Sequence, residues 1–496
     1  MGLKVVFVAS EATPLAKTGG LGDVAGALPA ALKALGCEVF TFLPYYREVD
    51  LRGIETEPTG VTVEIPIGVR VVSAELYRAL STEVTTYLLK RDEFYDRTYI
   101  YGTPEGGYFD NLERYGFFSR GVLEAIKALK IRPDIIHSND WQTGLVPAYL
   151  KDVYKKDKTF VRTASVFTIH NTAYQGTFQA ELYGLLGLAP GLFTHDGLEF
   201  WGKINLLKAG VAFSDIITTV SPGYSVEIQT PEFGCGLEGL LKKRSAELFG
   251  VLNGADYKEW DPGSDPLIPA NFSVDDMSGK TVCRRELLKT FGLKPGISTP
   301  VIGMISRLAE QKGYDILAEA LPALMKLDLA LVILGSGEKK YEELLKTLAA
   351  KYPKKLAVKV AFDNRLAHLV EAGSDVFLMP SKYEPCGLNQ IYSLRYGTVP
   401  VVRATGGLDD TVRGYPSARA TGFKFKDYSA PALVEKVKEA LDLYRDKKKW
   451  KALREKAMTE DFSWERSARK YIGLYRGALK KARREKKPLP KGVKRR

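Results

Sequence analysis

The sequence predicts an α/β protein made of two doubly wound domains. Near-continuous apolar runs alternate with amphipathic stretches before about residue 256, and the same alternation starts again after it. Runs rich in Val, Ile and Phe, without strict apolar–polar alternation, indicate parallel strands covered by helices on both faces. A chain of 496 residues also exceeds one ordinary domain. We therefore expect two Rossmann-like domains that face each other across a deep cleft.

The expected strands are spread over both halves of the chain. In the first half they are residues 3–9, 38–43, 134–137, 165–169 and 215–220. In the second half they are residues 300–306, 329–334, 356–360, 375–380 and 399–403. Helix-like segments at 23–35, 116–129, 314–325 and 339–351 separate several of them. Gly, Asp and Pro gather at 253–266, so we expect the domains at 1–255 and 256–479.

The net charge of +13 resides mostly at the C-terminal end of the sequence. Residues 480–496 carry ten Lys and Arg against the single acid Glu485, which leaves only +4 for the rest. A solvated, disordered tail is the expected state of 480–496, and nucleic-acid binding is not expected. The four cysteines form no Cys-x-x-Cys pair, which favours reduced thiols in a cytoplasm. No apolar run reaches the roughly 18 residues of a membrane span.

A glycine-rich segment, KTGGLGDV at residues 17–24, follows the first expected strand and opens a helix. Glycines there let backbone N–H groups approach an anion, and Lys17 adds a positive charge. The segment also fits the dinucleotide fingerprint G-x-G-x-x-A, which leaves a nicotinamide enzyme as an alternative. Two features disfavour that alternative. The glycines do not follow the strand directly, and no acidic residue closes the second strand.

Polar clusters follow several other expected strands, where doubly wound folds bind their ligands. HSNDWQ begins at His137, TIHN ends at Asn171, and SRLAEQKG contains the basic pair Arg307 and Lys312. Arg and Lys can neutralise a diphosphate leaving group. In PSKYEPCGL, the carboxylate of Glu384 can bind sugar hydroxyls, and the amides that follow can hold phosphate. RATGGL at 403–408 repeats the strand–glycine–helix arrangement, and no Asp-x-Asp motif for a divalent metal occurs.

Taken together, these motifs resemble those of the bacterial glycogen synthases and plant starch synthases. The resemblance runs in family order from residue 5 to about 470 and also includes TVSPGYSVEI at 219–228 and ATGGLDDTV at 404–412. It implies a GT-B fold whose last helix, about 463–479, packs back on the N-terminal domain. It further implies transfer of glucose from ADP-glucose to an α-1,4-glucan with retention of configuration, without a metal or other cofactor.

The resemblance also implies roles for individual residues. Catalysis would fall to Lys17, His170, Arg307, Lys312 and Glu384. Further substrate contacts would come from Gly19, Gly20, Tyr95, Asp140, Asn171, Asn205, Phe362, Cys386, Gly387, Leu388, Thr405, Gly406 and Gly407. Related enzymes often carry a second Glu eight positions after the first, and here that position is Tyr392. The family therefore suggests a same-face displacement in which the leaving phosphate helps to deprotonate the acceptor.

Two further alternatives remain from the sequence. Another GT-B transferase, with a UDP-glucose donor or a different glycan acceptor, would use the same basic residues. A non-catalytic glucan-binding scaffold would leave the phosphate-binding loops unexplained. Dependence of transfer on a glucan acceptor and on the donor nucleotide separates these possibilities.

Overall fold

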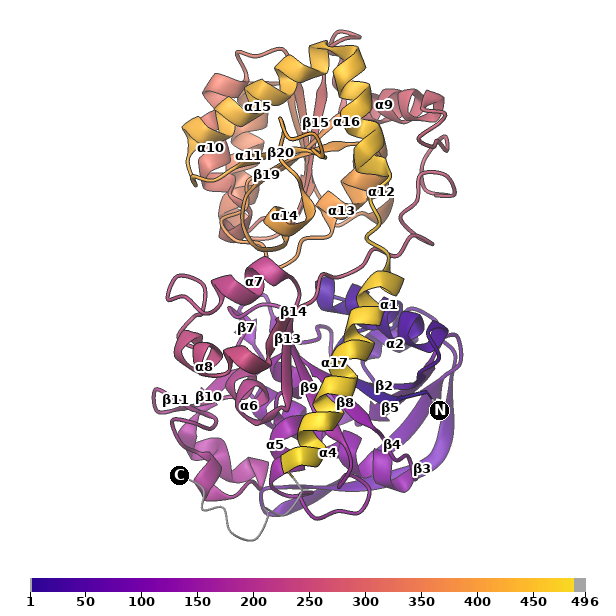
Figure 1. The fold of residues 1–496 in the computed structure, drawn as a ribbon, viewed down its shortest axis with the longest axis vertical. Coiled ribbons are helices and arrows are strands. Elements are labelled where there is room, and N and C mark those ends of the chain that lie inside the picture. The colour runs from indigo at the N-terminus through magenta and orange to yellow at the C-terminus, as the bar shows by residue number, and fades with distance from the viewer. Residues whose placement is uncertain (1, 486–496) are drawn as a thin grey trace. The chain divides into compact units, whose positions relative to one another are not determined.

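The computed structural model describes residues 2–485, which fall into two compact units (Figure 1). Within the described residues, unit 1 comprises 2–220, 225–254 and 464–485, and unit 2 comprises 221–224 and 255–463. The chain therefore leaves unit 1 briefly at 221–224, leaves it again at residue 255, and returns to it at residue 464 for a final helix. Residues 486–496, most of the expected basic tail, lie outside the described part of the chain.

Unit 1 is built on a nine-stranded sheet with the order β14-β13-β9-β8-β1-β2-β5-β4-β3. The seven strands from β14 to β5 pair in parallel, whereas β4 pairs antiparallel with both β5 and β3. In chain order the strands are β1 (Lys4–Val8), β2 (Glu38–Pro44), β3 (Thr56–Ile67), β4 (Arg70–Ala79), β5 (Thr85–Lys90), β8 (Ile135–Asn139), β9 (Ala164–Ile169), β13 (Ile216–Thr219) and β14 (Leu248–Gly250).

Side chains of the unit 1 strands alternate between two hydrophobic cores. In β1, Val6 and Val8 enter the core that contains α4 (Asn111–Ala128), whereas Val5 and Phe7 enter the opposite one. The opposite core contains α1 (Gly20–Ala34) and α17 (Trp464–Glu485), so helices cover both faces of the sheet. This double burial explains why the strands are apolar throughout rather than alternating.

Helix α17, drawn in yellow in Figure 1, lies against the unit 1 sheet although it follows the whole of unit 2 in sequence. Its buried face includes Tyr471 and Tyr475, and Lys481 pairs with Glu247 at 2.8 Å. The prediction that a disordered tail begins at residue 480 is wrong for residues 480–485. They continue the helix, because Ala482 is still buried in the core.

Unit 2 contains an all-parallel, six-stranded sheet with the order β17-β16-β15-β18-β19-β20. Numbered along the chain this is 3-2-1-4-5-6, the order of doubly wound nucleotide-binding folds. Helices α10 (Tyr314–Leu324), α11 (Lys339–Lys351) and α12 (Asn364–Gly373) connect the first four strands. The strands are β15 (Val301–Ile305), β16 (Ala330–Gly335), β17 (Leu356–Val360), β18 (Val376–Met379), β19 (Val399–Arg403) and β20 (Phe423–Phe425).

Each sheet has a switch point, where the crossover connections change direction. In unit 1 it lies between β1 and β8, and in unit 2 between β15 and β18. The carboxyl ends of two neighbouring strands meet there, and the loops that follow them diverge and leave room for a ligand. Within each unit, the motifs that follow the two switch-point strands are therefore the ones that the fold brings together.

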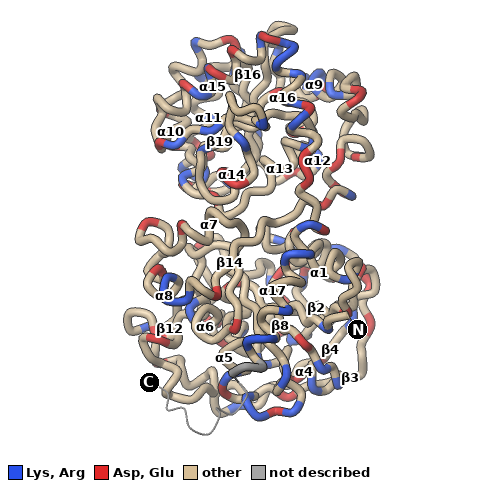
Figure 2. The backbone as a smooth tube through the Cα atoms, viewed as in Figure 1, with Lys and Arg blue, Asp and Glu red and all other residues tan. Residues whose placement is uncertain are grey.

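Charged residues are mixed over both units. Figure 2 shows Lys and Arg interspersed with Asp and Glu along the described chain.

Among residues 2–485, no helix has the length and apolar character needed to cross a membrane.

Candidate active site

In unit 1, a buried carboxylate holds the glycine loop in place. Glu11 accepts hydrogen bonds from the backbone N–H groups of Thr18 (2.5 Å) and Gly19 (3.1 Å), and from the Thr18 hydroxyl (2.7 Å). The Tyr101 hydroxyl also donates to Glu11, at 2.5 Å. These two backbone donors therefore point inward. The sequence analysis did not identify Glu11, although an acidic residue directly after a buried strand was the available signal.

The two glycines that open α1 border empty space. A Cβ atom added to Gly19 or Gly20 would meet no protein atom within 4 Å, and neither residue has a positive φ. The protein's own packing therefore does not require glycine there. By contrast, a Cβ on Gly22 would lie 3.0 Å from the Lys17 side chain. Lys17 is about one-third exposed and pairs with Asp23 at 2.6 Å, at the same helix start.

Asp140 directly follows β8 and has a strained backbone conformation. Its φ of 55° and ψ of −177° belong to a region that is essentially restricted to glycine, at a cost of about 1–3 kcal/mol. Its carboxylate accepts the backbone N–H of His170 at 2.7 Å. Burial, with a smaller contribution from the charge of Glu11, raises the pKa of Asp140 to about 7, against the hydrogen bonds from the amides of His170 and Asn171. Strain and a raised pKa at a switch point are typical of a functional carboxylate.

The two histidines that the sequence analysis singled out have different surroundings. His170 is partly exposed, and its Nε2 lies 3.0 Å from the Asn139 side-chain oxygen. Burial lowers the pKa of His170 to about 3, so the ring is neutral at pH 7. Because Nε2 faces an acceptor, it carries the proton, and Nδ1 is left with a lone pair that can accept a hydrogen bond from a hydroxyl group. The Asn171 side chain caps its own turn by accepting the N–H of Ala173 at 3.0 Å.

His137, in contrast, is fully buried and structural. Its Nδ1 lies 2.8 Å from the Tyr475 hydroxyl of α17, and its Nε2 lies 2.6 Å from the Thr168 hydroxyl. Both ring nitrogens are thus satisfied inside the protein.

Two other predicted contact residues are also buried. Tyr95 is 0% exposed, its ring packs on Phe94 and Phe117, and its hydroxyl donates to the Arg114 carbonyl at 3.0 Å. Asn205 is 0% exposed and forms the N-cap of α6 (Leu206–Phe213) through the N–H of Lys208. The structure therefore gives both side chains supporting positions in unit 1, with no exposed surface for a substrate.

In unit 2, the loops after β15 and β18 bring a lysine and a carboxylate together. Lys312 Nζ lies 2.5 Å from Glu384 Oε2, with side-chain exposures of only 15% and 7%. Ser381 also donates to Glu384, at 3.1 Å. Gly313 has a φ of +76°, and an added Cβ would lie 2.0 Å from the Pro380 carbonyl oxygen. The close approach of the two loops therefore requires glycine at this position.

The segment that follows Glu384 is fixed by a glutamine side chain. The Gln390 Nε2 group donates to the backbone carbonyl oxygens of Cys386 (2.9 Å) and Gly387 (3.0 Å), and Gly387 has a φ of +70°. Leu388 is the N-cap of the seven-residue helix α13 (Asn389–Arg395). Tyr392, in place of a second Glu, is buried, and its ring stacks on Trp260 at a centroid distance of 4.1 Å.

The third glycine turn contacts the same loop. The N–H of Gly407 donates to the Glu384 carbonyl at 3.0 Å, and a Cβ on Gly407 would lie 2.1 Å from the Cys386 carbonyl oxygen. Gly406 has a φ of +43° and opens α14 (Gly406–Thr411), whose N-cap is Thr405. The fold therefore gathers the three unit 2 segments, 307–313, 380–388 and 405–407, at one edge of the sheet.

Two predicted unit 2 residues present exposed side chains. Arg307 directly follows the switch-point strand and is exposed. Phe362 follows β17 and is 88% exposed, so its ring face is open for stacking.

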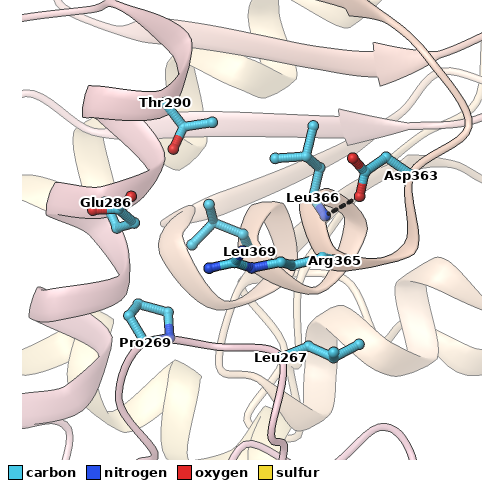
Figure 3. Close-up of a pocket in the computed structure, with 8 residues that line it drawn as sticks. All are labelled: Leu267, Pro269, Glu286, Thr290, Asp363, Arg365, Leu366 and Leu369. Atoms are coloured by element: carbon cyan, nitrogen blue, oxygen red, sulfur yellow. Dashed lines mark hydrogen bonds between the residues drawn. The ribbon is translucent and has the colours of Figure 1, made fainter.

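A small cavity elsewhere in unit 2 does not coincide with these residues. It measures about 210 Å³, lies between α9 (Ser278–Phe291) and α12, and is lined by charged Glu286, Asp363 and Arg365 among others (Figure 3). Asp363 is already engaged as the N-cap of α12, through the N–H of Leu366 at 2.9 Å. The cavity is smaller than ordinary ligand sites of about 300–1,000 Å³. None of the predicted substrate residues lines it.

Among residues 2–485, no group of three or more His, Cys, Asp or Glu side chains is arranged to hold a metal ion. The cationic side chains near the predicted phosphate positions are Lys17 in unit 1, and Arg307 and Lys312 in unit 2.

Comparison with known proteins assigns both units. The model of the starch synthase catalytic domain matches residues 4–243, and that of glycosyl transferases group 1 matches residues 293–458. The glycogen synthase of Koribacter versatilis is 46% identical, over 98% of this chain and 100% of its own length. That of Myxococcus xanthus is 50% identical, over 95% of this chain and 99% of its own.

Solved structures show the same relationship. The catalytic domain of starch synthase IV from Arabidopsis thaliana, bound to ADP and acarbose, superposes with a TM-score of 0.89 at 32% identity, covering 97% of this chain and 100% of that one. Sucrose-phosphate synthase from Thermosynechococcus elongatus shares the fold, with a TM-score of 0.58 at 17% identity over 96% and 99% of the two chains. The GT-B fold expected from the motifs is thereby confirmed. The chain belongs to the glycogen synthase and starch synthase family of glycosyltransferases.

Proposed function

We propose that this enzyme transfers glucose from ADP-glucose to the non-reducing end of an α-1,4-glucan, with retention of configuration. The observation that carries the proposal is the Lys312–Glu384 pair at the unit 2 switch point, beside the exposed Arg307. A nucleotide sugar presents a diphosphate, which needs cations, next to a hexose, which needs hydrogen-bond acceptors. This site contains both kinds of group on adjacent loops.

In this proposal, the cationic residues stabilise the leaving diphosphate. The bond between glucose C1 and the phosphate oxygen breaks, and negative charge accumulates on the leaving ADP. Arg307 and Lys312 neutralise that negative charge in the transition state. Glu384 keeps Lys312 in position through the 2.5 Å contact, and its carboxylate stabilises the positive charge that develops at C1.

The acceptor reacts on the face that the phosphate leaves. Its 4-hydroxyl oxygen forms the new bond to C1, and the hydroxyl proton passes to the departing phosphate oxygen. Asp140 and the neutral His170 orient the hydroxyls of the transferred glucose. In support, the strained backbone of Asp140 fixes its carboxylate, and the Nδ1 lone pair of His170 is suited to accept a hydrogen bond from a sugar hydroxyl. No covalent intermediate on a carboxylate is needed.

The donor and its location are parts of the same proposal. The exposed ring of Phe362 is available to stack on the adenine of ADP-glucose. The starch synthase IV structure, which contains ADP, supports an adenine nucleotide here. We propose that no divalent metal is required, since Arg307, Lys312 and Lys17 supply the positive charge. A cytoplasmic location accords with the four free cysteines.

The test is transfer of labelled glucose to glycogen from ADP-glucose and from UDP-glucose, side by side and with EDTA present. We expect strong incorporation from ADP-glucose, and complete release of the incorporated label by an α-1,4-specific amylase. A preference for UDP-glucose would overturn the donor assignment, and loss of activity in EDTA would overturn metal independence. No transfer from either donor by the folded enzyme would refute the proposed reaction.

A further inference from the structure

A hairpin turn in unit 1 presents an exposed tryptophan. Strands β11 (Glu199–Phe200) and β12 (Lys203–Asn205) are joined by Trp201 and Gly202, whose φ values are +48° and +75°. Two successive positive φ angles are characteristic of a type I′ turn, in which Asn-Gly and Asp-Gly are strongly preferred. A bulky aromatic residue at positive φ is a steric outlier. Trp201 is nevertheless 80% exposed, so burial does not compensate for the strain.

The tryptophan ring is held in place by its neighbours. Its centroid lies 4.5 Å from that of Phe200, with an angle of 31° between the planes. Gly236, at a φ of +85°, lies so close that an added Cβ would be 2.9 Å from atoms of both rings. The Glu199 carboxylate accepts the N–H of Gly202 at 2.7 Å and fixes the turn. An aromatic ring that is already ordered loses little entropy when a ligand binds to it.

A chain of hydrogen bonds joins this turn to the loop that carries the sugar-binding residues. Gln175 donates to the carbonyl oxygens of Cys235 (2.9 Å) and Thr172 (3.0 Å), and the Thr172 hydroxyl donates to the Phe233 carbonyl at 2.9 Å. Segment 233–236, on which Trp201 packs, is thereby tied to segment 171–175, which directly follows His170. Tyr174, on that segment, is a second aromatic side chain that is about half exposed.

We infer that Trp201 is a stacking platform for the α-glucan acceptor, at a glucose unit remote from the reacting end. The inference rests on the proposed function and extends it. The C–H face of a pyranose ring is apolar and packs on an indole face, whereas its hydroxyl groups need polar partners. Gln179 of β10 (Thr177–Gln179) and Lys203 of β12 lie opposite each other in an antiparallel pairing, are both exposed, and can supply these polar partners.

The surroundings favour a sugar chain over a protein partner. A stable protein interface buries about 800 Å² on each side around an apolar centre. Next to Trp201, the exposed residues at 199–203 include charged Lys203 and glycine rather than further apolar side chains. A single ordered ring with polar neighbours, connected to the site loop, suits a chain of repeated pyranose units.

The test compares Trp201→Asn with the native enzyme. Asparagine suits the type I′ turn, so the thermal midpoint should be equal to or above that of the native enzyme. The dissociation constant for maltoheptaose, measured by calorimetry without donor, should rise about three- to tenfold, in line with the loss of one aromatic stack. The KM for glycogen should rise similarly, while the KM for ADP-glucose is unchanged. Trp201→Phe should restore part of the affinity.

Val69→Asn is the matched control. Val69 is fully exposed and, like Trp201, lies in the two-residue turn of a unit 1 hairpin, here between β3 and β4. It should leave maltoheptaose binding unchanged. An unchanged dissociation constant in Trp201→Asn would overturn the inference, as would a change in oligomeric state by light scattering, which would indicate a protein interface. If the native enzyme binds maltoheptaose but transfers no glucose, the proposed function fails and the platform can still be tested.

Discussion

Lys312 and Glu384 lie 2.5 Å apart although 72 positions separate them in the sequence, and each follows a different strand of the same parallel sheet. The pair exists because β15 and β18 are neighbours at the switch point of unit 2, and because Gly313 lets the two loops touch. A cation and an anion that are both largely buried cannot be altered one at a time without a cost to the fold. Tests of the site must therefore measure the effect of a substitution on kcat separately from its effect on the stability of the fold.

Glu384→Gln should lower kcat about 100-fold or more, because the charge that stabilises the developing cation is lost while the side-chain shape remains. The thermal midpoint should also fall, since Lys312 keeps a buried charge without its partner. The double variant Lys312→Gln/Glu384→Gln is the control. It should regain most of the lost stability and none of the activity. Near-native kcat in Glu384→Gln would remove this residue from the proposed chemistry.

Gly20→Ala should leave the fold intact and weaken donor binding. The added methyl group meets no protein atom within 4 Å, and alanine favours a helix start at least as well as glycine. We expect an unchanged or higher thermal midpoint, with the KM for ADP-glucose raised about tenfold by a clash with the phosphates. Gly26→Ala gives the opposite control. Its Cβ would lie 2.7 Å from the Thr13 carbonyl oxygen, so stability should fall. Equal donor KM values in Gly20→Ala and the native enzyme would show that the space is not used.

Asp140→Asn should change how stability depends on pH. Burial raises the pKa of Asp140 from its ordinary 3.8 to about 7. Between these values the folded state keeps a proton that the unfolded state has released, so this group lowers stability as the pH rises from about 4 to about 7. Asparagine does not ionise and keeps an oxygen for the His170 amide. The thermal midpoint of the variant relative to the native enzyme should therefore increase across that window and then level off. A constant difference would mean that Asp140 titrates normally.

Tyr475→Phe should destabilise unit 1 without touching the chemistry. The change removes the hydroxyl that lies 2.8 Å from His137 Nδ1 and leaves a fully buried ring nitrogen without its partner. We expect a loss of about 1–3 kcal/mol, seen as a lower urea midpoint, with kcat unchanged at low temperature. Arg469→Ala, which removes an exposed ion pair with Glu465 on the same helix, should have almost no effect. Comparable midpoints for the two variants would contradict a stabilising role for the Tyr475–His137 contact.

The parallel strands were predictable because both of their faces are buried. Residues 3–9 and 300–306, for example, contain β1 and β15, and the structure places helices on both sides of each sheet. The sequence analysis missed strands β3, β4 and β5. Their signal is of a different kind, because Val63, Ile65 and Ile67 alternate with more exposed residues along β3. A search for continuous apolar runs overlooks such half-buried strands.

The position of a candidate residue was predictable where its motif directly follows a switch-point strand, as with Asp140, Lys312 and Glu384, whose roles stay predictions. It was not predictable where the role depends on packing. Tyr95 and Asn205 lie in matching motifs, yet their burial is a property of the folded core. Glu11 shows the converse, since its position beneath the glycine loop depends on how residues 12–18 fold back. The local sequence does not indicate how residues 12–18 turn back over the Glu11 carboxylate.

The placement of α17 bears on how the chain acquires its structure during synthesis. This helix supplies Trp464, Tyr471 and Tyr475 to a core that also contains β1, which is synthesised long before it. Until more than 200 intervening residues of unit 2 have been translated, the part of the unit 1 sheet that α17 covers therefore stays uncovered. Unit 2 consists of residues 255–463 and the short earlier segment 221–224. Its folding therefore does not depend on a segment that is translated later. A released chain that ended at residue 463 would accordingly contain a complete second unit and a first unit with an exposed apolar surface, which is a natural target for chaperones.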